Sequence, residues 1–223
     1  MELEPLYLTF KLAAITTFLL FFIAIPLCYW LVQTRSKFKP IIETIVSMPL
    51  VLPPTVLGFY FLVFLGPNHF LGSWLQNTFG IQLVFSFTGL IVASIIYSLP
   101  FMVHPIQAGL SSLPKSYTET AQLMGKSRFL ILSKVLLPNI KPAILTGIVL
   151  TFAHTIGEFG VVLMIGGNIP EKTKVASIAI YDEVEALNYT AANQYSLILL
   201  GISFAVLLSV YLINGGYLKR VVR

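Results

Sequence analysis

The stretch ETAQLMGKSRFLILSKVLLP, residues 119–138, is a half-polar, basic segment in a chain made mostly of long apolar runs. Residues 118–134 have a helical pattern that is interrupted by a lone glycine, Gly125. Glycine accepts backbone conformations that bend the chain. We therefore expect a short helix, a bend and then entry into the next apolar run, a shape suited to docking into another protein. An amphipathic helix lying on lipid is the alternative, and the glycine would interrupt it.

The composition around this segment is that of an integral membrane protein. Of all residues, 57% are hydrophobic and only 10% are charged, whereas soluble domains carry about 25% charged residues. The single cysteine, Cys28, excludes a disulfide framework and a thiolate metal site within the chain. Two acids precede the first base, unlike the positive leader of a signal peptide, so we expect the first apolar run to be kept as a span.

Five apolar runs are long enough to cross a bilayer, and the hydrocarbon core forces each to be helical. The sequence therefore predicts an all-α integral membrane protein in which residues 1–223 form a single transmembrane domain. The predicted spans are 12–32, 45–65, 85–110, 143–165 and 196–218. Pro49, Pro53 and Pro54 remove helix donors and should break or kink the start of the second span. The connection at 66–84 carries no charge, and the one at 166–195 contains a stretch that suits a short surface helix.

The bases are distributed unevenly between the two sides of the membrane. The connections after the first, third and fifth runs carry most of them: Arg35, Lys37, Lys39, Lys115, Lys126, Arg128, Lys134, Lys141, Lys219, Arg220 and Arg223. The opposite side has only Lys172 and Lys174, with Lys11 near a boundary. The positive-inside rule places the basic side in the cytoplasm. We therefore expect the N-terminus outside and the C-terminus inside, and the net charge of +5 does not indicate nucleic-acid binding.

No motif for ATP binding or hydrolytic catalysis is present. The nearest match to a phosphate-binding loop is GLSSLPKS, residues 109–116, where Pro114 replaces the second glycine and supplies no N–H. No G-x-S-x-G motif occurs. We expect no catalytic residues and no cofactor, so energy from ATP must come from a partner protein.

One ionisable side chain, Glu158 in HTIGEFG, lies deep within a predicted span, where charges are costly and mark functional or tightly paired positions. In one interpretation it locks helices together, through His154 one turn earlier or through backbone donors near Gly157 and Gly160. In the other it lines or gates a pathway. Haem ligation by His104 and His154 is disfavoured because the two residues are predicted at different depths, and we expect no metal site.

The docking-shaped segment resembles the cytoplasmic loop signature of ABC importer permeases, which runs E-A-A, then glycine, then I-x-L-P. Thr120 replaces an alanine and Val135 an isoleucine. The resemblance implies a coupling loop at about 112–138 that fits a cleft on a cytoplasmic ATPase. The implied ATPase-coupling residues are Glu119, Thr120, Ala121, Met124, Gly125, Leu137 and Pro138.

Residues 48–66, 152–160 and 167–181 are similar to segments of molybdate permeases, with sulfate permeases as the nearest relatives. This likeness implies a type I ABC importer permease fold in the bacterial inner membrane and import of an oxyanion, molybdate first, with sulfate or tungstate as alternatives. The implied partners are a second copy of the chain, an ABC ATPase dimer, a periplasmic or lipid-anchored oxyanion-binding protein and membrane lipid. Candidates for the pathway or gate are Pro53, Pro54, His154, Gly157, Glu158 and Gly160.

Two other classes stay open on the residues alone. An ion-coupled secondary transporter would use Glu158 and His154 as a proton relay and need no ATPase. A non-transporting anchor subunit of a redox complex would need haem between its helices.

Overall fold

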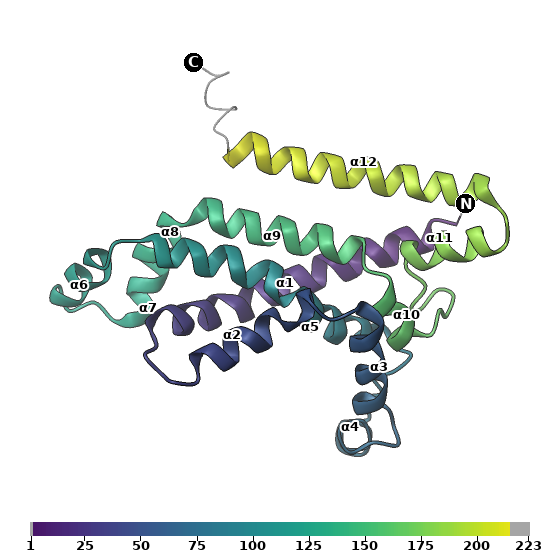
Figure 1. Ribbon diagram of the computed structural model, residues 1–223, viewed down its shortest axis with the longest axis horizontal. Coiled ribbons are helices and arrows are strands. Elements are labelled where there is room, and N and C mark those ends of the chain that lie inside the picture. The colour runs from purple at the N-terminus through teal and green to yellow at the C-terminus, as the bar shows by residue number, and fades with distance from the viewer. Residues whose placement is uncertain (1, 215–223) are drawn as a thin grey trace.

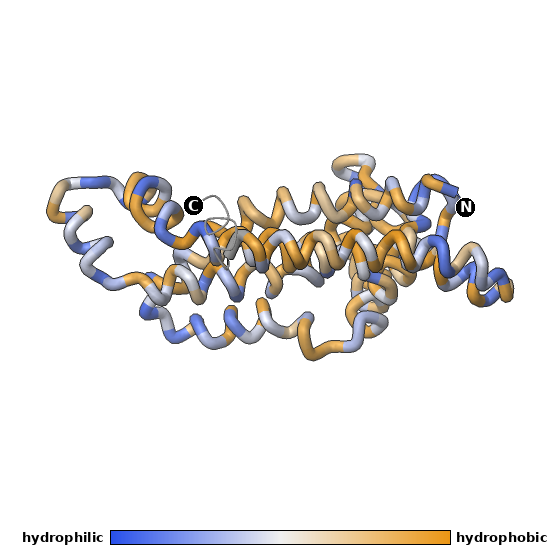
Figure 2. The backbone as a smooth tube through the Cα atoms, turned by 90° about the horizontal axis from the view of Figure 1, so that it is seen from above, coloured by the Kyte–Doolittle hydropathy of each residue, from blue (hydrophilic) through white to orange (hydrophobic). Residues whose placement is uncertain are grey.

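The computed structural model describes residues 2–214, and all regular structure in that range is helical (Figure 1). The long helices run side by side, with α6 at one end of the molecule and α10 and α11 at the other. Hydrophobic residues dominate the middle of the bundle and hydrophilic ones gather towards its two ends (Figure 2). This distribution fits helices that cross a bilayer.

Three helices are long and apolar enough to cross a membrane: α1 (Glu4–Gln33), α5 (Phe87–Ser112) and α12 (Tyr189–Asn214). Two further crossings consist of bent helix pairs, which gives up to five spans. The prediction of five spans is consistent with this count, but two of them are not single helices.

The second predicted span is broken at its prolines. It comprises α2 (Lys39–Ser47), η1 (Met48–Leu50) and α3 (Pro54–Leu65), and α3 is bent by 111° from the helix before it. Pro53 and Pro54 supply no N–H to continue the helix, and Pro54 instead starts α3, where a missing donor costs nothing. The predicted break at the prolines is confirmed.

The fourth predicted span, 143–165, is also divided. It consists of α9 (Lys141–Ile156) and α10 (Gly160–Gly166), separated by Gly157, Glu158 and Phe159. The prediction of one continuous span is therefore wrong. Before α9 come α7 (Arg128–Ile131), the π-helical η2 (Leu132–Leu136) and α8 (Leu137–Asn139), which together are bent by 82° relative to α9.

The connections at the α10 end are partly helical. The uncharged connection contains α4 (Phe70–Phe79), and the second contains α11 (Ala176–Glu185), which confirms the predicted surface helix. Lys174 and Asp182 form an ion pair here, with 2.7 Å between Nζ and Oδ2. Asn168 Nδ2 also donates to both oxygens of this carboxylate, so the loop before α11 is tied to the helix.

The core has two main parts along the bundle. Near α6, α1 and α5 pack with residues of the predicted coupling segment, 112–138, around Cys28, Met102 and Ile131, all fully buried. Near the other end, α1 and α5 pack with α3, α10 and α11 around Leu12, Leu90 and other buried apolar residues. Helix α1 lies between these partners along its whole length, so it connects the two ends mechanically.

Helix α12 packs against α11 and α9 but stands apart from the rest of the bundle (Figure 1). Its apolar side chains are largely exposed, as at Leu200 and Phe204, which are 67% and 65% exposed. The end of the fifth predicted span, 215–218, and the bases Lys219, Arg220 and Arg223 lie outside the described residues.

Candidate functional site: the coupling segment and two interhelical polar clusters

The coupling segment forms a helix followed by a tight turn. Helix α6 (Ser116–Leu123) has Met124 as its C-terminal cap, and Gly125 has a φ of +71°. The Gly125 N–H donates to the Gln122 carbonyl at 2.9 Å and the Lys126 N–H to the Ala121 carbonyl at 3.1 Å. Such left-handed closure favours glycine. The predicted short helix and bend are confirmed, although α7, η2 and α8 come between the bend and α9.

The two faces of this segment differ in chemistry. Ala121 is only 7% exposed and packs into the core near Ile131. On the outer side, Leu123, Met124 and Phe129 are 90%, 68% and 79% exposed and form what we call the apolar knob. Sequence reasoning missed Leu123 and Phe129 because their exposure depends on how the turn places them.

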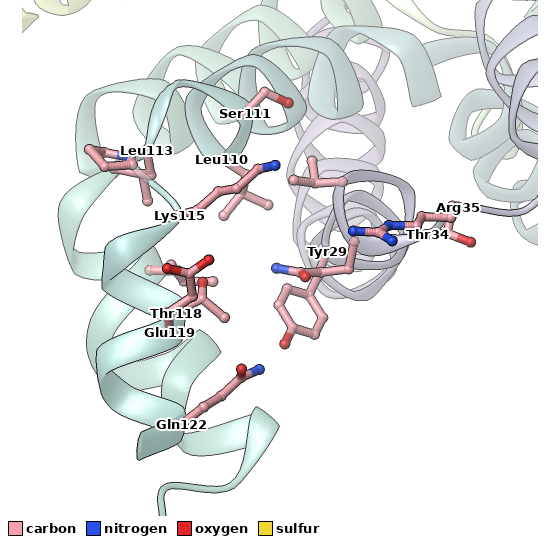
Figure 3. Close-up of a pocket in the computed structure, with 14 residues that line it drawn as sticks. Tyr29, Thr34, Arg35, Leu110, Ser111, Leu113, Lys115, Thr118, Glu119 and Gln122 are labelled. Atoms are coloured by element: carbon pink, nitrogen blue, oxygen red, sulfur yellow. The ribbon is translucent and has the colours of Figure 1, made fainter. Parts of the chain in front are cut away.

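The polar side of α6 faces a groove against its own chain (Figure 3). This groove has a volume of about 530 Å³ and lies between α6, the end of α5 and the segment after α1. Glu119, Lys115 and Arg35 line it, and none of the three forms an ion pair within the part of the chain that the structure describes. Glu119 is therefore directed towards the bundle, while the apolar knob is solvent-facing.

The remaining residues of the motif hold other positions in the same segment. Thr120 is exposed, Leu137 packs partly into the core, and Pro138 is exposed within the short α8. Leu137 and Pro138 thus lie immediately before the bend into α9.

A first polar cluster joins α5 to the break between α9 and α10. Ser94 Oγ donates to Glu158 Oε2 at 2.7 Å, and Glu158 is only 3% exposed. One turn along both helices, Ser98 Oγ lies 2.9 Å from His154 Nδ1 and 3.0 Å from Thr155 Oγ1. The imidazole also stacks on an aromatic ring of α5. The two bridges lie one helical turn apart and connect the same two segments.

The number of hydrogens that each of these groups can donate determines which group is the donor in each hydrogen bond. Thr155 donates its hydroxyl hydrogen to the Thr151 carbonyl at 2.9 Å. Ser98 therefore donates to Thr155 and accepts from the His154 ring N–H. Glu158 and His154 do not hydrogen bond to each other; each binds a serine of α5, so the predicted lock through His154 is corrected. The i, i+4 spacing of Ser94 and Ser98 in an apolar run was the signal that could have identified them.

The two helix breaks meet next to this cluster. A Cβ added at Gly160 would lie 2.9 Å from Pro54 Cβ, so the start of α10 is pressed against the start of α3. Gly157 ends α9, and the Glu158 carbonyl accepts from Ser177 Oγ of α11 at 2.6 Å. The structure thus brings Pro54, Gly160 and the Glu158 break together at one place in the fold.

A second polar cluster joins α2 to the half of α5 that lies nearer α6. Ser47 Oγ lies 3.0 Å from His104 Nε2, and Gln107 Nε2 donates to Glu43 Oε1 at 2.7 Å. His104 and His154 therefore hydrogen bond to serines of different helices.

Comparisons with known proteins agree with this architecture. Residues 21–223 match the family described as "Binding-protein-dependent transport system inner membrane component". The chain is 44% identical over 210 residues to the molybdenum transport system permease protein ModB of Azotobacter vinelandii, covering 94% of this chain and 93% of that protein. It is 33% identical over 193 residues to the sulfate transport system permease protein CysT of Escherichia coli K12, covering 86% and 69%.

Solved structures share the fold at low sequence identity. A bacterial ABC transporter that imports the acidic polysaccharide alginate aligns with a TM-score of 0.76 at 20% identity, over 99% of this chain and 80% of that one. The inward-facing MetNI methionine ABC transporter aligns with a TM-score of 0.73 at 18% identity, over 96% and 94%.

These matches decide between the classes that the residues alone left open. They span nearly the whole chain and place it among transport subunits, which removes the ion-coupled carrier and the redox anchor. The chain belongs to the inner membrane components of binding-protein-dependent transport systems, and it is a multi-pass transport subunit of the ABC importer permease type, not an enzyme.

Proposed function

We propose that this chain is the permease subunit of an ATP-driven importer that carries molybdate into the cytoplasm. The likeness to ModB at 44% identity supports molybdate over sulfate, since the CysT protein is 33% identical. Tungstate has the same tetrahedral oxyanion chemistry and belongs to the same proposal. In the proposed orientation the α6 end is cytoplasmic and the N-terminus is outside, in line with the uneven distribution of bases.

The exposed apolar knob is the observation that best supports the proposed coupling to an ATPase. Three large apolar side chains in water favour burial in a partner. Their position on a turn that is anchored to the core through Ala121 would transmit motion of that partner into the bundle. We propose that the knob enters a cleft on an ABC ATPase, that two copies of the chain surround the pathway, and that an oxyanion-binding protein delivers substrate at the α10 end.

The two helix breaks have a proposed role in gating. The Ser94–Glu158 and Ser98–His154 bridges hold α9 and the start of α10 against α5. Gly160 in turn lets α10 pack on Pro54 at the start of α3. We propose that these contacts make α3, α5 and α10 move as one body during alternating access, since packed helices switch by rigid-body rotation.

The test is uptake by the complete transporter in proteoliposomes, with its ATPase and binding protein. We expect molybdate and tungstate uptake to require ATP and to persist when an uncoupler removes the proton gradient. Preferred uptake of sulfate would refute the substrate assignment. Uptake that follows the proton gradient without ATP would refute the mechanism.

A further inference from the structure

A polar groove lies between α2 and α5 in the inner half of the helical bundle. It has a volume of about 320 Å³ and is lined chiefly by Glu43, Ser47, His104, Gln107, Ala108 and Ser111. Glu43 and Ser47 lie one turn apart on α2, and His104, Gln107 or Ala108, and Ser111 lie on successive turns of α5, so one face of each helix lines the groove.

Polar side chains bridge the groove although both helices belong to membrane-crossing segments. Ser47 and His104 form one bridge, at 3.0 Å, and Gln107 and Glu43 form the other, at 2.7 Å. The His104 side chain is exposed, and Glu43 and Ser47 are partly exposed. Ionisable groups within membrane-crossing segments are costly and face the interior of the bundle or a water-filled cavity. We infer that water reaches this groove from the α6 end.

The chemistry of the lining changes abruptly towards the break before α3. An adjoining hollow of about 580 Å³ continues from Glu43 and Ser47 to Met48 and Val51. Met48 and Val51 are 45% and 83% exposed and offer no hydrogen bond from their side chains. Apolar constrictions close ion pathways by excluding water. The polar track therefore ends at these two residues, immediately before the proline break.

We propose that Ser47, His104 and Gln107 form a transient contact site for a tetrahedral oxyanion in the inner half of the transport route. This inference rests on the proposed import function and adds the residues that meet the substrate before its release. A hydroxyl, an imidazole N–H and an amide are hydrogen-bond donors that suit the four acceptor oxygens of such an anion.

The charges that line the groove keep the binding of the oxyanion weak. The Glu43 carboxylate opposes a dianion, and Lys39 Nζ, 3.8 Å from Glu43 Oε1, offsets that charge only in part. A site in a pathway must release its ion readily, so weak binding is what transport requires. We expect Glu43→Gln to strengthen retention of the oxyanion and slow its release.

Cysteine accessibility in the assembled transporter tests both water access and oxyanion contact. Ala108 lines the groove and is exposed, and the native Cys28 is fully buried, so Ala108→Cys introduces one reactive thiol into the permease. The matched control is Ile96→Cys on the same helix, an apolar position that is 40% exposed. Modification by a charged, water-soluble thiol reagent is followed through the mass of the permease subunit in the absence of nucleotide.

We expect Ala108→Cys to react at least about tenfold faster than Ile96→Cys, because the reactive thiolate needs a polar surrounding. A site with a Kd near 1 mM is half occupied at that concentration, so millimolar molybdate should slow the reaction about twofold. Chloride at equal ionic strength should not slow the reaction. Equal rates at the two positions would overturn the aqueous groove, and absence of protection by molybdate would overturn the contact site.

The donors are tested with the double variant Ser47→Ala/His104→Leu. We expect it to abolish molybdate protection of Ala108→Cys, whereas Ser112→Ala, which removes a hydroxyl bonded only to its own helix, keeps it. Thermal unfolding verifies that both variants fold. Protection that survives in the folded double variant would refute the assignment of the donors. Wild-type uptake of molybdate is measured separately, so that failure of the contact site and failure of the proposed function are distinct results.

Discussion

Replacement of Gly125 tests whether the turn after α6 is a docking surface. The residue has a φ of +71°, and a Cβ built there meets nothing within 4 Å. A side chain added there therefore leaves the backbone into open space. Gly125→Leu thus places bulk where an ATPase would sit, next to the apolar knob.

The effect of backbone strain at this position can be separated from the effect of side-chain size. A left-handed conformation costs an ordinary residue about 1–2 kcal/mol, which changes the population of the native turn by roughly 5–30-fold. Gly125→Ala carries this strain with little bulk. Gly125→Asn carries bulk with less strain, because asparagine adopts positive φ more readily.

We expect Gly125→Leu to insert and fold normally and to lose binding-protein-stimulated ATP hydrolysis and molybdate uptake by more than the roughly 30-fold that strain alone allows. Gly125→Ala should lose less. The assays are copurification with the ATPase, ATP hydrolysis and uptake in proteoliposomes, with thermal unfolding as the control for folding. Normal uptake by Gly125→Leu would refute docking at this turn. Equal losses for leucine and alanine, with near-normal activity for asparagine, would show that only the backbone conformation matters.

Three further predictions concern the α10 end of the bundle. Gly160→Ala should reduce uptake, because its Cβ would lie 2.9 Å from the proline at the start of α3, whereas Gly201→Ala, with nothing within 4 Å, should leave uptake unchanged. Ser94→Ala should lower stability in detergent by about 1–3 kcal/mol, because it removes the side-chain donor to the buried carboxyl group of Glu158. Asp182→Asn should lower stability by less than about 1 kcal/mol, because the ion pair with Lys174 is partly exposed. The hydrogen bond that the Lys174 ammonium donates to Asp182 raises the pKa of Lys174, so this contribution is complete below the ordinary lysine pKa and is lost as the pH rises through the raised value.

Each of these predictions has an outcome that contradicts it. Equal uptake by the Gly160 and Gly201 variants would show that the contact between the two helix breaks tolerates a methyl group. An unchanged unfolding temperature for Ser94→Ala would show that the bridge to the Glu158 break contributes no stability. An Asp182 variant that loses the same stability at pH 7 and at a pH above the raised pKa of Lys174 would exclude Lys174 as the partner that matters, since the neutral amine no longer forms an ion pair.

Local chemistry accounts for the parts of the site that could be predicted from sequence. Gly125 marks a bend because no other residue adopts positive φ so cheaply. The prolines before α3 break a helix wherever they occur, since they lack the N–H. Long apolar runs must be helical in a bilayer for the same hydrogen-bonding reason.

The rest depends on contacts between segments far apart in the chain. The sequence alone determined an all-helical membrane protein, the break at Pro53 and Pro54, and the bend and family motif of the coupling segment. Only the tertiary structure decided that Glu158 binds Ser94, that Ser47 faces His104 across a groove, and that Gly160 meets the proline break. Hydrophobic periodicity predicts that a helix forms. The hydrogen-bond partner of each buried polar side chain depends on which helix packs beside it, and only the tertiary structure decides that.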